Sequence, residues 1–212
     1  MKKVTDIILA LALAVLMIFL SVIFTVNFKQ LYYYDANRLQ LAQKEDISFE
    51  EIKLNYDYLV KYNLSREEKE FDMPTINYSK EGKIHFEEVR IIVQNIIDLM
   101  ILISIVCIIS IFLKLRNKEI EFMNITSKFM MILPIILAIP IVVDFDRSFV
   151  IFHEILFDND YWIFNPVTDP VINILPAEFF MHAGMLILLL IFTISVILKV
   201  GYFKLKKRIS DY

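Results

Sequence analysis

The sequence predicts a mainly α-helical membrane protein: a polytopic bundle of four transmembrane helices with a small extracytoplasmic α+β cap. Hydrophobic residues make up 58% of the 212 residues, and the mean hydropathy is +0.58, which is typical of membrane proteins. Four apolar runs are each long enough to cross a hydrocarbon core about 30 Å thick, which takes about 20 helical residues. Basic residues gather at one set of ends of these runs, as the positive-inside rule requires.

The four predicted spans cover residues 7–26, 91–113, 125–143 and 179–203. The first is expected to remain as an uncleaved anchor, because it is too long for a signal-peptide core and no small-residue cleavage site follows it. The third contains Pro134 and Pro140, so a kink is expected there.

The charges orient the chain across the membrane. Lys and Arg flank one set of span ends, from Lys2 to Arg208, whereas segment 144–178 is acidic and has Arg147 as its one basic residue. Both termini are therefore predicted to be cytoplasmic. The predicted organisation is a cytoplasmic N-terminus with the first span (1–26), an extracytoplasmic cap (27–90), the second span (91–113), a cytoplasmic loop (114–124), the third span (125–143), an extracytoplasmic loop with the active-site motif (144–178), the fourth span (179–203) and a cytoplasmic tail (204–212).

Local patterns predict the secondary structure of the cap. Two S-x-x-E pairs, beginning at Ser48 and Ser65, have the spacing of capping boxes and predict two short helices. Residues 75–78 and 83–86 flank a Ser-Lys-Glu-Gly turn, and this pattern predicts a β-hairpin that delivers His85 just before the second span.

Several functional classes find no support in the sequence. Cys107 is the single cysteine and falls mid-span, so no disulfide, Cys–His metal cluster or cysteine dyad is expected. No phosphate-binding glycine loop, G-x-S-x-G or H-E-x-x-H motif occurs, and the outer charges form no basic face. Asp158, Asn159, Asp160 and Asp169 could be calcium ligands, but the EF-hand glycine and glutamate are missing, so turn and capping roles are favoured. We expect no metal, no cofactor and no nucleic-acid partner.

The three histidines, His85, His153 and His182, all map to the outer side, where imidazoles could exchange protons near neutral pH. The alternative is that each is a hydrogen-bonded interfacial histidine. A functional role is more favoured for His85 and His153 than for His182 inside the fourth span. Carboxylates lie beside both: Glu87 and Glu88 next to His85, and Glu154 next to His153.

Two further features allow two interpretations each. Arg90, Gln94 and Asp98 recur every four residues and predict a polar helix face, which could be a floor under the outer site or an ion pairing that holds the bundle together. Trp162 and Phe164 fit an aromatic belt at the headgroup level, or a groove for acyl chains.

Two segments carry a resemblance to a known family: HFEEVR (85–90) before the second span, and FHEILFDNDYWIFNPVTDPVINILPAEFF (152–180) before the fourth. Together with the length, the four spans and the position of the cap, they make the chain similar to the lipoprotein intramolecular transacylase (Lit) family of low-GC Gram-positive bacteria.

The resemblance implies an acyltransferase of the bacterial cytoplasmic membrane with its active site at the extracytoplasmic face. Its partners would be membrane lipids and a diacylglyceryl-modified lipoprotein. It would move the sn-2 acyl chain to the α-amine of the N-terminal cysteine and release the lyso-form lipoprotein. The family's catalytic histidines carry over to His85 and His153. Supporting or substrate-binding roles are expected for Arg90, Asp98, Glu154, Asn159, Trp162 and Asp169.

The chemistry of this transfer requires a base. An α-amine has a pKa near 8 and is mostly protonated at neutral pH, so a histidine must remove a proton, and a proton must reach the departing glyceryl oxygen. We favour His85 as the base and His153 as the group that polarises the carbonyl or protonates the alkoxide. A covalent acyl-histidine relay is the open alternative.

Two rival functions remain. Phe149-x-x-x-His153 and Glu87-Glu88 resemble elements of the CAAX-type intramembrane glutamate proteases, although Arg90 stands at the wrong spacing for their motif. A non-enzymatic sensor or assembly factor is the other rival, but the predicted cytoplasmic ends are too short to signal alone.

Overall fold

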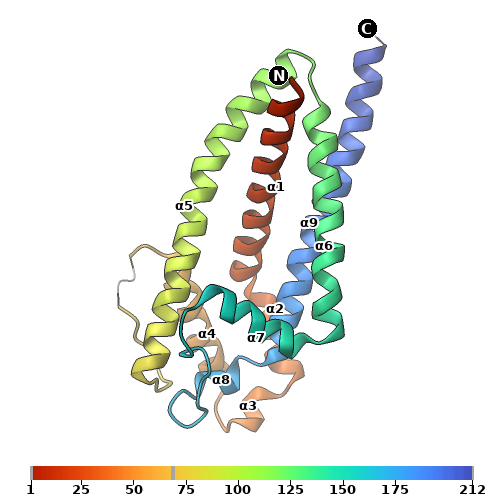
Figure 1. Cartoon of the computed structure of the whole chain (residues 1–212). Helices are drawn as coiled ribbons and strands as arrows, with labels where there is room; N and C mark the ends of the chain where they lie inside the picture. The colour runs from red at the N-terminus through yellow and green to blue at the C-terminus, as the bar shows by residue number, and fades with distance from the viewer. Residues whose placement is uncertain (1, 68–69, 212) are drawn as a thin grey trace. The chain divides into compact units, whose positions relative to one another are not determined.

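The computed structural model describes residues 2–67 and 70–211, and over these ranges the chain folds into helices joined by turns and loops, without a strand (Figure 1). In chain order the helices are α1 (Lys2–Asn27), α2 (Lys29–Arg38), α3 (Leu41–Lys44), α4 (Phe49–Leu64), α5 (Lys80–Arg116), α6 (Glu121–Val143), α7 (Phe145–Leu156), α8 (Val171–Ile174) and α9 (Ala177–Ser210).

The chain divides into two compact units. Unit 1 comprises residues 2–23, 96–142 and 185–211, and unit 2 comprises the described residues of Phe24–Asn95 and Val143–Gly184.

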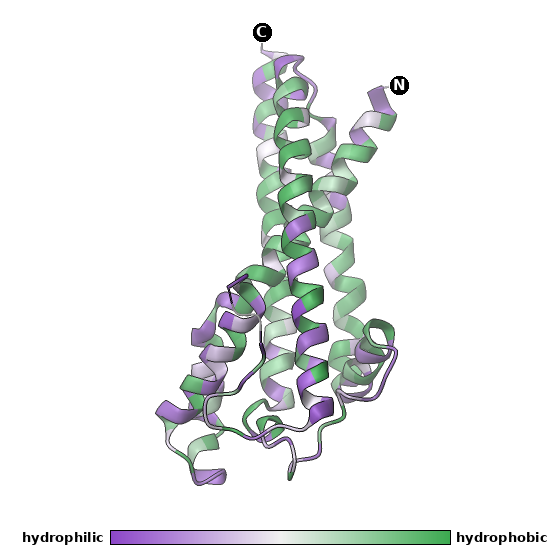
Figure 2. Cartoon of the chain, turned by 90° about the vertical axis from the view of Figure 1, so that its left-hand side faces the viewer, coloured by the Kyte–Doolittle hydropathy of each residue, from purple (hydrophilic) through white to green (hydrophobic). Residues whose placement is uncertain are grey.

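Four helices of the described chain are long and apolar enough to cross a membrane: α1, α5, α6 and α9. Figure 2 shows hydrophobic residues along most of their length, and polar residues among them in the N-terminal part of α5. This confirms the four spans predicted from the sequence. The helix α6 continues through Pro134 and Pro140.

Small residues let the helices of unit 1 pack closely. Ala10, Ser127 and Ser195 are fully buried, and Ser195 Oγ donates a hydrogen bond to the Ser127 carbonyl over 2.9 Å. Without a hydrophobic driving force in lipid, such close packing and interhelical hydrogen bonds hold transmembrane helices together.

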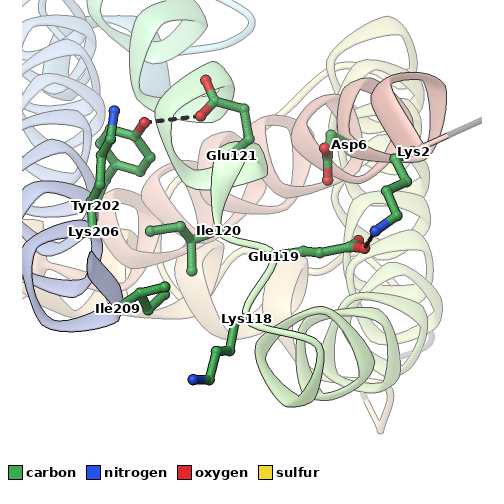
Figure 3. A pocket seen from close by; sticks show the side chains of 9 residues that line it. All are labelled: Lys2, Asp6, Lys118, Glu119, Ile120, Glu121, Tyr202, Lys206 and Ile209. Atoms are coloured by element: carbon green, nitrogen blue, oxygen red, sulfur yellow. Dashed lines mark hydrogen bonds and ion pairs between the residues drawn. The ribbon is translucent and has the colours of Figure 1, made fainter. Parts of the chain in front are cut away.

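Charged residues gather around a pocket of about 300 Å³ in unit 1 (Figure 3). The ammonium group of Lys114 lies 2.8 Å from both Asp6 and Glu119, and Lys2 lies 2.9 Å from Glu119. Tyr202 donates a hydrogen bond to Glu121 over 2.9 Å. The pocket is lined by none of the three histidines, and we regard it as part of the ionic network that ties the helix ends together.

The core of unit 2 is aromatic. Tyr32 from α2 is fully buried and stacks on Tyr56 from α4, with ring centroids 3.6 Å apart. Its hydroxyl donates to the Ile174 carbonyl over 2.7 Å, which ties α2 to α8. Phe179, at the start of α9, packs edge-on against both tyrosine rings. This core fixes the segments that carry the histidines.

The helix start predicted at Ser48 is confirmed, because the Ser48 hydroxyl accepts a hydrogen bond from the Glu51 amide and α4 begins at Phe49. The partner of Ser65 in the second predicted box, Glu68, lies outside the described residues.

The predicted α+β cap is wrong, because unit 2 has helices but no strand in its described part, and residues 80–86 form the start of α5. The Ser-Lys-Glu-Gly segment is a helix start and not a hairpin turn. Ser79 accepts hydrogen bonds from the Gly82 amide with its hydroxyl, at 2.9 Å, and from the Lys83 amide with its carbonyl, at 3.0 Å. These are the contacts of an N-terminal helix cap, which satisfy amides that a strand would pair elsewhere.

Candidate active site

His85 lies on the second turn of α5 and is buried, with 6% of its surface exposed. Its ring contacts Phe157 and Phe164 edge-on, at centroid distances of 4.8 and 5.4 Å. These two aromatic side chains come from the loop that follows α7, so the site is built by segments far apart in the sequence.

His153 lies on α7, which begins after Asp144, whose carboxylate accepts a hydrogen bond from the Arg147 amide. Phe149 and His153 lie one turn apart on one face of α7, and Phe157 is the residue that follows the end of the helix. Of the three, His153 and Phe157 are buried.

A backbone carbonyl fixes the tautomer of His153. Its Nδ1 lies 2.7 Å from the Phe149 carbonyl oxygen. Because a carbonyl can only accept, Nδ1 carries the proton, and in the neutral ring Nε2 is left with a lone pair. Burial lowers the pKa of His153, and the hydrogen bond to Phe149 opposes this shift in part. A histidine of ordinary pKa near 6.5 that is shifted downward is neutral at pH 7, so Nε2 can accept a proton.

The two histidines come together as the sequence predicts. Their ring centroids are 6.0 Å apart, and Trp162 stacks on the His153 ring with a centroid distance of 4.7 Å. The surrounding rings of Phe149, Phe157 and Phe164 are apolar. Such a lining excludes water and strengthens the electrostatic interactions inside it.

Two polar contacts hold the loop after α7 against the start of α5. Asn159 Nδ2 donates to Glu88 Oε1 over 2.9 Å, and Asp169 Oδ1 accepts from the Ser79 amide over 2.8 Å. Asn159 also caps the next turn, because its Oδ1 accepts from the Tyr161 amide. Asn159 and Asp169 therefore have the turn and capping roles favoured over calcium binding.

The other residues singled out in the sequence lie elsewhere. Arg90 donates to the Ser65 carbonyl and lies over the Tyr62 ring, so it binds the end of α4. Asp98 belongs to unit 1 and Glu154 is exposed on α7. His182 forms a separate pair in unit 2, where its Nδ1 lies 2.8 Å from the fully buried carboxylate of Asp35.

Three buried polar atoms of this site have no hydrogen-bond partner among the residues that the structure describes: His85 Nδ1, Glu88 Oε2 and Trp162 Nε1. Buried polar groups of native proteins are almost always paired, so each such atom calls for an explanation. Glu88 is not among the site residues predicted from the sequence, where it stands only beside His85 and in the Glu87-Glu88 pair of the protease alternative. Its position one turn after His85, on the same helix face, is the signal that could have included it.

Known proteins resemble this chain in sequence and in structure. The family model for the lipoprotein intramolecular transacylase Lit matches residues 7–180. A solved structure of the membrane integral lipoprotein intramolecular transacylase Lit from Bacillus cereus is 34% identical, with a TM-score of 0.96, and the match covers 100% of this chain and 99% of that one. The comparison with curated proteins gives no match.

Two further solved structures are variants of the same Bacillus cereus protein. The H85R variant is 35% identical to this chain, with a TM-score of 0.88 over 99% of this chain and 95% of that one. The H85A variant is 34% identical, with a TM-score of 0.90 over 100% of this chain and 96% of that one.

Proposed function

The chain belongs to the Lit family of lipoprotein intramolecular transacylases, and from this premise we propose that it moves the sn-2 acyl chain of an S-diacylglyceryl lipoprotein to the α-amine of its N-terminal cysteine. The product is the lyso-form lipoprotein, which carries an N-acyl and an S-monoacylglyceryl group. The observation that carries the proposal is the buried pair of His85 and His153, in which the Phe149 carbonyl leaves Nε2 of His153 free to accept a proton.

His153 moves the proton in this mechanism. The α-ammonium first releases one proton to solvent, and the uncharged amine then attacks the ester carbonyl while Nε2 of His153 takes a second proton from the nitrogen. The new N–C bond forms, the bond from the carbonyl carbon to the sn-2 oxygen breaks, and the same proton passes from His153 to that oxygen. One proton has moved from nitrogen to oxygen, and the enzyme returns to its starting state.

His85 is assigned to the carbonyl oxygen. Negative charge develops on that oxygen during the attack, and hydrogen-bond donors placed there are often worth about 2.7–4 kcal/mol in other enzymes. His85 Nδ1 and Trp162 Nε1 are buried and lack a partner within the described chain, so both can supply such a bond. This assignment reverses the preference for His85 as base, because the Phe149 carbonyl sets the tautomer of His153.

The protein also has to fold the substrate. Direct attack passes through an eight-membered ring of nitrogen, two cysteine carbons, sulfur, two glyceryl carbons, the ester oxygen and the carbonyl carbon. Holding this ring closed supplies the proximity gain of a well-oriented intramolecular reaction, up to roughly 7–11 kcal/mol. The aromatic side chains around the two histidines are suited to hold it.

The active site is proposed to lie at the extracytoplasmic face, with both termini in the cytoplasm, because the Lys- and Arg-rich ends of the spans are expected inside. The exposed face of α7 supports a membrane-interface position, since Ile151, Phe152 and Ile155 are apolar and 44–77% exposed. Membrane lipids and the lipoprotein's acyl chains are the expected neighbours of this face.

The test is mass spectrometry of a synthetic S-diacylglyceryl-cysteine peptide incubated with the purified protein. An acyl chain on the cysteine nitrogen, with loss of one acyl chain from the glyceryl group, is the expected result. Cleavage of the peptide would support the intramembrane protease instead, and an unchanged peptide the non-enzymatic sensor or assembly factor. A matched peptide with an ether in place of the sn-2 ester cannot transfer its chain and is the control.

A further inference from the structure

We propose that Glu88 is the site that binds the α-ammonium group of the lipoprotein's N-terminal cysteine and so selects substrates with a free N-terminus. The inference rests on the proposed function and assigns to this site a residue that the two-histidine mechanism does not use.

Glu88 is held in place from one side only. Its Oε1 accepts the hydrogen bond from Asn159 Nδ2, and Asn159 is itself fixed by the Tyr161 amide. Glu88 Oε2 is buried and has no hydrogen-bond partner in the ranges 2–67 and 70–211. One oxygen of the carboxylate is therefore positioned by the protein, and the other is left to accept a hydrogen bond from a bound substrate.

The neighbouring cations have other partners. Lys83 lies 4.0 Å from Glu87, and Arg90 donates to the Ser65 carbonyl and covers the Tyr62 ring. Neither ion pairs with Glu88 in the structure. A buried carboxylate oxygen without a hydrogen-bonding partner is costly, so a donor from the substrate is the group that fits Oε2.

The unpaired acceptor and donor atoms of the site complement the donor and the acceptor of the proposed substrate. A carboxylate oxygen only accepts, and the indole N–H of Trp162 only donates. The reacting end of the proposed substrate has one cationic donor, the α-ammonium, and one acceptor, the ester carbonyl. Glu88 lies one turn after His85, and Asn159, which holds it, lies three residues before Trp162, which stacks on His153. The ammonium site and the carbonyl site are thus built from the same two segments, the start of α5 and the loop after α7.

The carboxylate has a specific consequence for substrate choice. A charge-assisted hydrogen bond to an ammonium is about twice as strong as one between neutral groups, and an amide nitrogen cannot supply it. A cysteine whose nitrogen is still in a peptide bond, or is already acylated, therefore loses this interaction. Glu88 thus also disfavours rebinding of the N-acylated product.

The experiment measures binding of two unreactive peptides that carry ether-linked chains, one with a free α-amine and one with an N-acetyl group. For the wild-type protein we expect the free amine to bind about tenfold more tightly or better. In Glu88→Gln, which keeps an oxygen for Asn159, this preference should fall to about twofold or less. Glu88→Asp, which keeps the charge, should retain part of it.

Glu87→Gln is the matched control, because Glu87 is the adjacent carboxylate of α5 and pairs with Lys83 at a half-exposed position. It should keep the wild-type preference. An unchanged preference in Glu88→Gln, or an equal loss in Glu87→Gln, would overturn the inference.

Conversion of the ester-linked peptide by the wild-type protein separates this result from the proposed function. If the wild-type protein converts the ester and Glu88→Gln keeps the amine preference, the ammonium site alone is refuted. If the wild-type protein does not convert the ester, the proposed function fails and the inference fails with it.

Discussion

The backbone of Gly82 lies directly against the carboxylate of Asp169, so that a Cβ atom added at Gly82 would overlap Asp169 Oδ1. The same oxygen accepts the hydrogen bond from the Ser79 amide at the start of α5, and Asp169 is 3% exposed. Eighty-seven positions separate Gly82 from Asp169 in the chain, by the difference of their numbers. This contact holds the loop after α7 against the helix that carries His85.

Replacing Gly82 with Ala is expected to lower the melting temperature and the transacylase rate. Alanine is the better helix former by about 1 kcal/mol, so local propensity alone would stabilise α5. The overlap with the buried Asp169 carboxylate should outweigh this gain. Gly201→Ala is the control, because its added Cβ would meet only the flexible end of Met123, at 3.2 Å. Equal or higher stability in Gly82→Ala, by thermal unfolding, would contradict the packing described here.

Replacing His153 with Ala should reduce the rate by about 10²–10⁴-fold, because the group that accepts and returns the proton is lost. Replacing His85 with Ala removes one donor to the carbonyl oxygen and should cost about 10²–10³-fold. Both variants should remain folded in the membrane. The rates are read from the N-acylated peptide by mass spectrometry, with Asp146→Asn, an exposed carboxylate of α7, as the control. Full activity in either histidine variant would remove that residue from the mechanism.

Titration of His153 by NMR should show a pKa below the ordinary value near 6.5, because burial disfavours the charged form of the ring. The spectrum of His153→Gln assigns that signal. Below this pKa the ring is protonated and cannot act as a base, so the rate should fall as the pH is lowered through it. A His153 signal that titrates at or above pH 7 would be inconsistent with a neutral base at the working pH.

Replacing His182 with Ala should destabilise the protein by about 1–3 kcal/mol, since the fully buried Asp35 carboxylate then loses its hydrogen bond from Nδ1. His182→Asn can keep a donor near the same place and should lose less. The transfer rate of the folded fraction should change far less than in His153→Ala, which separates a structural histidine from a catalytic one. Chemical denaturation and the peptide assay together measure both quantities.

The contribution of the ionic network around Glu119 to the stability of the protein should depend on pH. Hydrogen bonds from Lys114 and then from Lys2 hold the pKa of Glu119 at about 2, below its ordinary value of 4.5. The folded state therefore favours the charged carboxylate. This contribution is complete above pH 4.5 and is lost as the pH falls towards 2. The melting temperature should decline over this window, and the decline should be smaller in Glu119→Gln. The same slope in both proteins would show that Glu119 does not contribute.

Local pattern was sufficient for the membrane helices. A run of about 20 apolar residues needs no distant partner to be recognised, because the bilayer itself is the solvent that selects it. The capping box at Ser48 is likewise a contact within one helical turn.

Predictions from local sequence pattern failed where contacts between distant segments determine the structure. The segment 75–86 has the residues of a hairpin, but Ser79 caps α5 and Asp169 binds the Ser79 amide from a distant loop. The polar face that includes Arg90 and Gln94 turned out to bind the carbonyls that end α4.

The sequence by itself determined that this protein has four helices able to cross a membrane, since these follow from hydrophobic runs along the chain, and its resemblance to the Lit family indicated the two imidazoles proposed to carry the chemistry. Only the tertiary structure decided that His153 keeps its proton on Nδ1, that Asn159 positions Glu88, and that Trp162 stacks on His153. The physical reason is that a side chain's tautomer, charge and hydrogen-bond vacancies are set by the atoms around it, and those atoms come from segments that only folding brings together.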